Sequence, residues 1–347
     1  MRKRALALFL LGCLVLGSFG CAGQPPQVTT TEPTTEPTTQ PTQSTEPTQS
    51  KEEPEMTDYF GALFPQDGNI PTKKEFDEIV GGLAENASRI SEINYTWIRG
   101  KRSMEVLSGI YDDYRTLEAP QENPVQQVYG ESQYYNYLLY LPEGYDPADT
   151  ETKWPVIYFF HGIGEIGSDL DMLTRYGMPK YLTEGGKVDA IMIAPQCPEG
   201  SHWADTNVEV ERLAQFVPEM TEKYNIDTNR MYLTGLSMGG RCTWKLALAM
   251  PDTFAAIAVV CGRTNTYEFE TIADMPIWMF HGVKDDTVSF DNINKILPVL
   301  EEKNHRYYKL TVFPTLSHDV WTTVYGRPDV YEWLLSQSLE KNAQAVK

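Results

Sequence analysis

Short apolar runs alternate with amphipathic stretches along most of the chain after residue 125. The apolar runs are continuous and brief, which is typical of strands buried on both faces of a parallel sheet; they span 154–160, 190–195, 230–236, 254–260, 276–280 and 307–315, after a first alternating run at 134–146. Between them apolar residues recur at helical spacing, over residues 208–226, 238–254, 290–304 and 328–339. This order predicts one α/β domain over residues 125–347, with a mainly parallel sheet and helices on both faces.

Residues 57–124 follow a different pattern. Apolar residues stand three and four positions apart over residues 71–93 and 103–119, which predicts helices. No motif in this segment carries obvious chemistry. We expect a helical extension that packs on the α/β domain and stabilises it.

Residues 1–21 have the parts of an export signal: a basic start, an apolar stretch and small residues that end at Cys21. The box LGSFGC resembles that of bacterial lipoproteins, in which the cysteine is lipidated and becomes the new N-terminus. LLGC at Cys13 is the alternative box. We expect export, with a lipid anchor at Cys21 or simple secretion, because the apolar stretch is too short for a comfortable membrane span.

Residues 22–56 consist almost entirely of Thr, Pro, Glu, Gln and Ser, a composition that cannot bury enough apolar surface to fold. We expect a linker that reaches on the order of 100 Å when extended. Such a linker would hold the α/β domain clear of the cell envelope, so the substrate is expected outside the cell. The membrane would then be a partner only through the lipid anchor.

Composition narrows the classes of partner. The formal net charge is −19, which would repel phosphate backbones and argues against a nucleic-acid partner. Only Cys197, Cys242 and Cys261 remain after the signal, with neither a CxxC spacing nor an even count, so we expect no disulfide framework. The five histidines lack the close spacing of a metal site, and we expect no metal and no cofactor.

The segment YLTGLSMGG contains a G-x-S-x-G motif centred on Ser237. It lies between a predicted strand and a predicted helix, where a sharp turn would leave the serine hydroxyl protruding at the carboxyl edge of the sheet. The glycines lack the side chains that would clash in so tight a reversal. Ser237 is therefore the candidate nucleophile.

A serine nucleophile needs a base and an acid, which follow it in the order Asp or Glu, then His, in this type of fold. Asp285 and Asp286 come directly after the predicted strand 276–280, and His318 comes after the last strand. Asp285 is the better acid because it comes sooner off the strand, and Asp286 is expected to cap the next segment. For the oxyanion hole we expect the backbone N–H groups of Met238 and Ile163.

The remaining histidines and some neighbours are weaker candidates. His161 and His281 each follow an apolar strand and precede a glycine, a position that usually orders a loop. His305 is expected to face solvent. We place five residues tentatively at the substrate: His161, Glu165, His202, Trp203 and Trp321. Aromatic residues in such loops are equally often plain packing.

The sequence resembles the secreted α/β-hydrolase esterases related to feruloyl and acetylxylan esterases (carbohydrate esterase family one) and to polyhydroxybutyrate depolymerases, often labelled predicted peptidases. The shared blocks are FFHGIGEIGSD, IAPQCPEGSHW, IDTNRMYLTGLSMGGRCTWKLALAMPDTFAAIAVVCG, MFHGVKDDTVSF and SHDVWTTVYGRPDVYEWLL. The resemblance implies the α/β-hydrolase fold with Ser237 as nucleophile, Asp285 as acid and His318 as base. Cys242 stands where the family commonly has glycine, and residues 57–124 lie outside its pattern.

The resemblance implies an extracellular serine carboxylesterase that hydrolyses feruloyl or acetyl esters of plant polysaccharide. Lipase-like members insert a lid after the strand 254–260, and this chain has no room there for a large one. A peptidase of the prolyl oligopeptidase type, a polyhydroxyalkanoate or small-ester hydrolase, and a tethered binding protein without activity are the alternatives. The acyl group, the polymer and the oligomeric state stay open.

Overall fold

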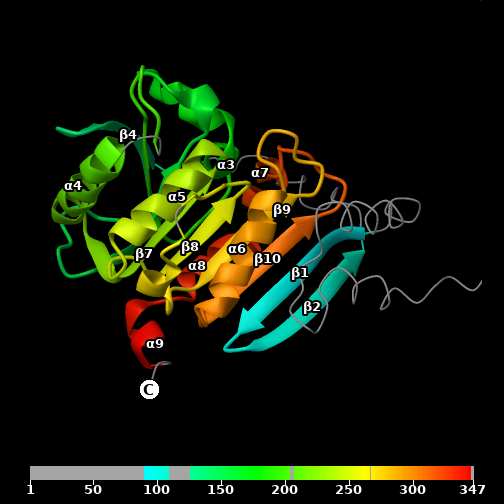
Figure 1. The fold of residues 1–347 in the computed structure, drawn as a ribbon. Coiled ribbons are helices and arrows are strands. Elements are labelled where there is room, and N and C mark those ends of the chain that lie inside the picture. The colour runs from blue at the N-terminus through cyan, green and yellow to red at the C-terminus, as the bar shows by residue number, and fades with distance from the viewer. Residues whose placement is uncertain (1–89, 109–125, 204–206, 266, 345–347) are drawn as a thin grey trace, which may run out of the picture. The chain divides into compact units, whose positions relative to one another are not determined.

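The computed structural model describes residues 90–108, 126–203, 207–265 and 267–344 (Figure 1). The predicted signal over 1–21, the linker over 22–56 and most of the predicted helical extension lie outside these residues. The strands are β1 (Ile90–Ile98), β2 (Lys101–Ser108), β3 (Gln126–Glu131), β4 (Asn136–Leu141), β5 (Trp154–Phe160), β6 (Ile191–Pro195), β7 (Ile226–Leu236), β8 (Ala256–Val260), β9 (Ile277–Gly282) and β10 (Tyr307–Phe313). The helices are η3 (Ile163–Glu165), η4 (Leu170–Arg175), α3 (Gly177–Thr183), α4 (Asn207–Lys223), α5 (Met238–Ala249), η5 (Phe269–Ile272), α6 (Asp291–Glu302), α7 (Trp321–Tyr325), α8 (Pro328–Leu335) and α9 (Leu339–Gln344).

All of these strands belong to one sheet, in the order β2-β1-β10-β9-β8-β7-β5-β6-β4-β3. The six strands from β10 to β6 pair in parallel, and antiparallel strands flank them on both sides. Only residues 261–276 connect β8 to β9, and their described part holds one short helix, η5. The prediction of an α/β-hydrolase fold with a mainly parallel sheet and no large lid is confirmed.

Helices cover the sheet on both faces, and the side chains of each strand alternate between the two faces. Val156, Tyr158 and Phe160 of β5 belong to the core cluster that includes α4, α5 and α6, whereas Ile157 and Phe159 belong to the cluster that includes α3, α7 and α8. This period of two is the natural spacing of a strand, and burial on both faces explains the continuous apolar run. Figure 1 shows α4, α5 and α6 in front of the sheet.

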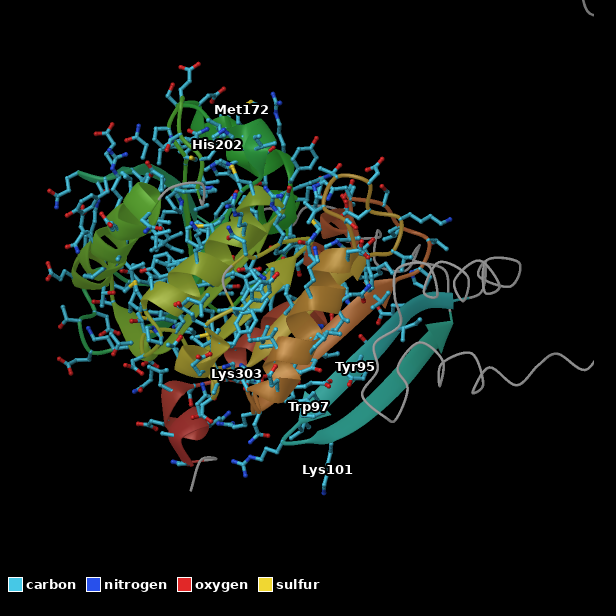
Figure 2. The ribbon with its side chains drawn as sticks, in the orientation of Figure 1. Tyr95, Trp97, Lys101, Met172, His202 and Lys303 are labelled. Carbon is cyan, nitrogen blue, oxygen red and sulfur yellow. The ribbon has the colours of Figure 1, made fainter. Side chains whose placement is uncertain are left out.

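The prediction of helices is wrong for residues 90–108, which form an antiparallel hairpin of β1 and β2. β1 pairs with β10, so the hairpin extends the sheet and is part of the α/β domain, which therefore begins before residue 125. Ile93, Tyr95 and Trp97 stand two apart and are all buried in the cluster that includes α6. Figure 2 shows Tyr95 and Trp97 on β1 beside α6.

The hairpin turn carries its own signal. Arg99 and Gly100, the two residues between the strands, have φ of 45° and 80°. Positive φ at both central residues is the conformation of the two-residue turns that match strand twist. Ile90 and Ile93 stand three apart and so also fit a helical spacing. This ambiguity between periods of 3.6 and 2 led to the wrong prediction at the start of β1.

A buried ion pair fastens the hairpin to the far end of the chain. Arg327, just before α8, donates to the Glu92 carboxylate on β1, and both side chains are about 4% exposed. Arg327 also donates two hydrogen bonds, of 2.9 and 2.6 Å, to the Asp329 carboxylate. A second hydrogen bond to Glu92 comes from Asn94, at 3.1 Å. The ion pair therefore joins two segments, β1 and the start of α8, that are far apart in sequence.

His305 is fully buried, which corrects the expectation that it faces solvent. Nε2 donates to the carbonyl of Ile272 at 3.0 Å, and the backbone carbonyl of His305 accepts from the Trp97 indole at 2.8 Å. The residue thus lies under the hairpin. Burial lowers the pKa of His305 to about 4, because the charged ring would lose its hydration.

This pKa predicts a loss of stability in acid. The pKa is near 6.5 in the unfolded chain, so between pH 6.5 and about 4 the unfolded state binds a proton that the folded state refuses. The free energy of unfolding should fall by on the order of 3 kcal/mol per such histidine across this window, and no further below it. His305→Gln keeps a donor for the Ile272 carbonyl but cannot take up a proton. Urea unfolding at several pH values should therefore show a smaller slope of the free energy of unfolding against pH, by the equivalent of one proton. An unchanged slope would contradict the assignment.

No helix of the described residues is both long enough and apolar enough to cross a membrane.

Candidate active site

Ser237 lies in the turn between β7 and α5, with φ 53° and ψ −113°. A non-glycine residue with positive φ is strained, and this strain turns the side chain out of both elements. A Cβ on Gly239 would lie 1.9 Å from the Phe160 carbonyl oxygen, and one on Gly235 would lie 2.5 Å from that of Gly239. The packing of α5 onto the sheet thus requires both glycines of the motif.

Three side chains from separate loops meet at this turn. His318 Nε2 lies 2.9 Å from Ser237 Oγ, and His318 Nδ1 lies 2.8 Å from Asp285 Oδ2. Since a carboxylate only accepts, Nδ1 carries the hydrogen of the neutral ring and Nε2 is free to accept from the serine hydroxyl. The structure brings together the nucleophile, base and acid that the sequence predicts, although their catalytic role stays a prediction.

The loops that carry Asp285 and His318 are hydrogen bonded to one another. Val283 N donates to Phe313 O at 3.1 Å, and Lys284 N donates to Leu316 O at 3.1 Å. These bonds continue the parallel pairing of β9 and β10 beyond the ends of the strands. The carboxylate and the imidazole are therefore held in register by backbone before any substrate binds.

Asp285 is buried and Asp286 is exposed. Asp285 Oδ1 accepts from the backbone N–H groups of Thr287 and Val288, at 3.0 and 2.7 Å. The expectation that Asp286 caps the next segment is wrong in this respect, because Asp285 makes these bonds. Burial disfavours the charged form, but hydrogen bonds from His281, His318 and Val288 outweigh it and hold the pKa of Asp285 well below its usual range.

The two backbone N–H groups expected at the oxyanion hole belong to first residues of helices, Met238 of α5 and Ile163 of η3. Such groups have no partner within their own helix. A Cβ on Gly162 would lie 4.0 Å from Cβ of Ser237, so the backbone before Ile163 passes beside the serine. The role of these two N–H groups as oxyanion donors stays a prediction.

Glu165 and His161 are buried and hold this loop through hydrogen bonds to its backbone. Glu165 is 4% exposed and accepts from the N–H of Gly162 at 2.9 Å. His161 is 1% exposed; its Nδ1 donates to the Gly162 carbonyl at 2.6 Å and its Nε2 accepts from Cys197 N at 2.9 Å. Burial raises the pKa of Glu165 and lowers that of His161 to about 4.

The structure corrects three of the tentative substrate contacts. His161 and Glu165 are buried and use their polar atoms to hold the loop. Trp203 is fully buried and packs edge to face against His161, Phe160 and Tyr135. Burial of its large apolar ring in the core stabilises the fold. His161, Glu165 and Trp203 therefore expose no surface that a substrate could contact.

The other two tentative contacts keep some exposure. Trp321 is partly exposed, and its ring stands edge to face on His318 at 5.1 Å and on Tyr176 at 5.9 Å. Tyr176 is 40% exposed. Trp321 therefore borders the imidazole, and Tyr176 packs against Trp321. His202 is also partly exposed.

One further side chain belongs to this centre. His281 is fully buried, and its Nε2 lies 3.3 Å from Asp285 Oδ2. The sequence indicated only that it orders a loop. The signal that could have identified it is its position four residues before the acid, at the end of the same strand.

Among the described residues, Cys261, Asp285 and His318 form one group of potential metal ligands, with one ligand atom from each within 4.8 Å of the others. The Asp285 and His318 atoms are already hydrogen bonded, and burial raises the pKa of the Cys261 thiol, which disfavours the thiolate that metals bind. The donor set therefore fits proton transfer better than metal binding. The expectation of no metal and no cofactor stays a prediction.

Comparison with known proteins identifies similar hydrolases and esterases. Residues 181–323, less than half of the chain, match the dienelactone hydrolase family. A bifunctional acetylxylan esterase/xylanase of Neocallimastix patriciarum is 24% identical over 46% of this chain and 24% of its own length. A probable feruloyl esterase C of Aspergillus terreus is 31% identical over 40% of this chain and 49% of its own. The chain thus spans about a quarter and about half of these two curated relatives.

Among solved structures, a thermostable esterase is 25% identical, with a TM-score of 0.52 over 69% of this chain and 67% of its own. The resemblance to feruloyl and acetylxylan esterases that the motifs indicated is confirmed. The chain has the α/β-hydrolase fold, and its sequence is similar to that of the dienelactone hydrolase family and of feruloyl and acetylxylan esterases.

Proposed function

We propose that the protein is a serine carboxylesterase that hydrolyses feruloyl or acetyl esters of plant polysaccharide. One observation carries the proposal: a continuous hydrogen-bond chain from Ser237 through His318 to Asp285, on a strained turn between strand and helix. The names of the curated relatives support the substrate class.

The chemistry follows from the direction of the hydrogen bonds. Ser237 Oγ attacks the ester carbonyl as its proton passes to His318 Nε2, and ionised Asp285 stabilises the imidazolium. The N–H groups of Met238 and Ile163 bind the developing oxyanion. His318 then protonates the leaving alcohol, which gives an acyl-serine. A water molecule, deprotonated by His318, attacks the acyl-serine and releases the acid, and the proton returns to Ser237.

The surroundings of the triad support an aromatic or sugar-linked substrate. Trp321 packs on His318 and Tyr176 packs on Trp321, while Ile163, 62% exposed, stands on the loop beside Ser237. Exposed apolar side chains that flank a reactive group are typical of a site that binds an acyl or sugar ring. The short β8 to β9 connection, without a large lid, leaves room for an ester attached to a polymer.

Activity on p-nitrophenyl acetate, feruloylated arabinoxylan and acetylated xylan tests the proposal. We expect hydrolysis of p-nitrophenyl acetate and of at least one of the two polysaccharide esters. A fluorophosphonate probe should label Ser237 in the wild type and not in Ser237→Ala. If the protein hydrolyses none of the three substrates and the probe does not label it, the proposal is wrong.

Trp321→Ala should distinguish aromatic acyl groups from acetyl. Loss of stacking on the acyl ring costs about 1 kcal/mol, which would raise KM for a feruloyl ester roughly fivefold. KM for p-nitrophenyl acetate cannot serve as the control, because its leaving group is aromatic; ethyl acetate can. Equal changes in KM for methyl ferulate and ethyl acetate would show that Trp321 does not bind the acyl ring.

Hydrolysis should not depend on a metal ion. The triad supplies the nucleophile and the base, and the backbone N–H groups of Met238 and Ile163 supply the oxyanion donors, all without a metal ion. Prolonged treatment with EDTA is therefore expected to leave kcat and KM unchanged. Esterase activity that disappears with EDTA and returns with Zn²⁺ would contradict the mechanism.

The place of action is part of the proposal. The sequence over residues 1–56 supports export and a lipid anchor at Cys21, with a polysaccharide-linked or soluble ester as partner and no nucleic acid. Incorporation of labelled palmitate that is lost in Cys21→Ser and kept in Cys13→Ser would test the anchor; the opposite pattern would assign it to Cys13.

A further inference from the structure

His281 occupies a protected position behind the acid of the triad. It lies near the end of β9, is 0% exposed, and has the ring of Phe290 edge-on at 5.7 Å. No substrate can reach it there. Its ring is nevertheless in contact with the Asp285 carboxylate, four residues later in the chain.

The contacts of His281 define which ring nitrogen carries the hydrogen. Nε2 lies 2.7 Å from the carbonyl oxygen of Val288 and 3.3 Å from Asp285 Oδ2. Both are acceptors, so Nε2 is the donor. Nδ1 is buried and has no hydrogen-bond partner among the described residues. A single N–H therefore points between the carbonyl and the carboxylate.

These contacts complete the surroundings of the Asp285 carboxylate. Oδ1 is held by the N–H groups of Thr287 and Val288, and Oδ2 is shared by His318 and His281. Val288 thus contacts Asp285 through its N–H and His281 through its carbonyl. The turn over residues 285–288 is fixed at both ends, and the carboxylate cannot rotate without breaking several bonds at once.

We propose that His281 is a positioning residue for hydrolysis, which holds Asp285 so that Oδ2 faces Nδ1 of His318. The inference rests on the proposed function, because only a reaction through His318 makes the orientation of Asp285 matter. The other titratable groups around the carboxylate are His318, buried Cys261 at the end of β8, and exposed Lys284 and Asp286. Within this set, His281 and His318 are the side chains that donate to Oδ2.

Two polar substitutions separate the hydrogen bond from the mere presence of a polar side chain. In His281→Gln the amide nitrogen can occupy the place of Nε2. The side chain of His281→Asn is shorter, and its amide nitrogen falls near the place of Nδ1. We expect His281→Gln to keep kcat for p-nitrophenyl acetate within about threefold of the wild type. His281→Asn should lower kcat about 10- to 100-fold with KM unchanged, because the loss concerns orientation of the base and not substrate binding.

His305 offers a matched control. It is also 0% exposed, also donates through Nε2 to a backbone carbonyl, and also has a buried Nδ1 without a partner among the described residues. It does not contact Asp285. If burial and the carbonyl bond were all that mattered, His305→Asn and His281→Asn would lower kcat equally. We expect His305→Asn to alter stability and leave kcat of the folded protein unchanged.

A proton NMR readout separates this inference from the proposed function. The Nδ1 proton of His318 in its bond to Asp285 should resonate far downfield in the wild type and in His281→Gln. It should be lost or displaced in His281→Asn. An active wild type with equal kcat and an identical resonance in all three proteins would overturn the role of His281. A wild type that shows the resonance but hydrolyses no ester would overturn the proposed function instead.

Discussion

Replacing Ser237 by glycine is expected to abolish hydrolysis and to make the fold more stable. Removal of a serine nucleophile in a triad lowers kcat by about 10⁴- to 10⁶-fold, because the base and acid act only through it. The serine also has φ of 53°, a strained conformation that costs about 1–3 kcal/mol. Glycine adopts this conformation without strain, and part of that gain is offset by its greater freedom in the unfolded chain.

Ser237→Ala is the matched control, because it removes the same oxygen and keeps the strain. Both variants should be inactive, and the free energy of unfolding in urea should be about 1 kcal/mol higher for glycine than for alanine. A glycine variant less stable than the alanine variant would contradict the strained turn. Activity above about 1% of wild type in either variant would contradict the role of Ser237.

Replacing Arg327 by methionine is expected to give the largest loss of stability. The substitution leaves the Glu92 carboxylate buried without its cation, which typically costs about 3–5 kcal/mol. Asp329 also loses its partner, but its side chain is 47% exposed and can be hydrated instead. The free energy of unfolding, measured in urea at pH 7, should fall by this amount.

A second variant shows whether the loss comes from the unpaired charge. Replacing Glu92 by leucine together with Arg327 by methionine removes both charges, and should restore most of the stability lost in the single variant. Asp329→Asn, at the exposed side of the same arginine, should cost less than about 1 kcal/mol. Additive losses in the double variant would show that Glu92 and Arg327 stabilise the fold independently.

The parts of the site that the sequence predicted are those fixed by chain order and strand ends. Ser237, Asp285 and His318 each follow a buried strand, and carboxyl ends of parallel strands meet at one edge of the sheet. The predicted choice of Asp285 over Asp286 agrees with the hydrogen bond to His318. For such residues a position along the chain is enough to predict a position in space.

Burial could not be predicted in the same way. Trp203 and His305 lie in polar stretches of sequence, yet both are fully buried because segments distant in the chain cover them. β1, for example, covers His305 through Trp97. The hairpin itself was missed because Ile90 and Ile93, at the end of the predicted helix 71–93, fit a helical spacing, and only pairing with β10 favours the strand. Tertiary contacts decide such cases, and local patterns do not contain them.

The position of β1 has a consequence for any shortened form of the protein. A fragment of residues 125–347 would lack the strand that pairs with β10, and the backbone N–H and C=O groups on that side of β10 would become an open sheet edge. Open edges of this kind recruit strands from other molecules and promote aggregation. The smallest soluble hydrolase unit should therefore begin upstream of Ile90.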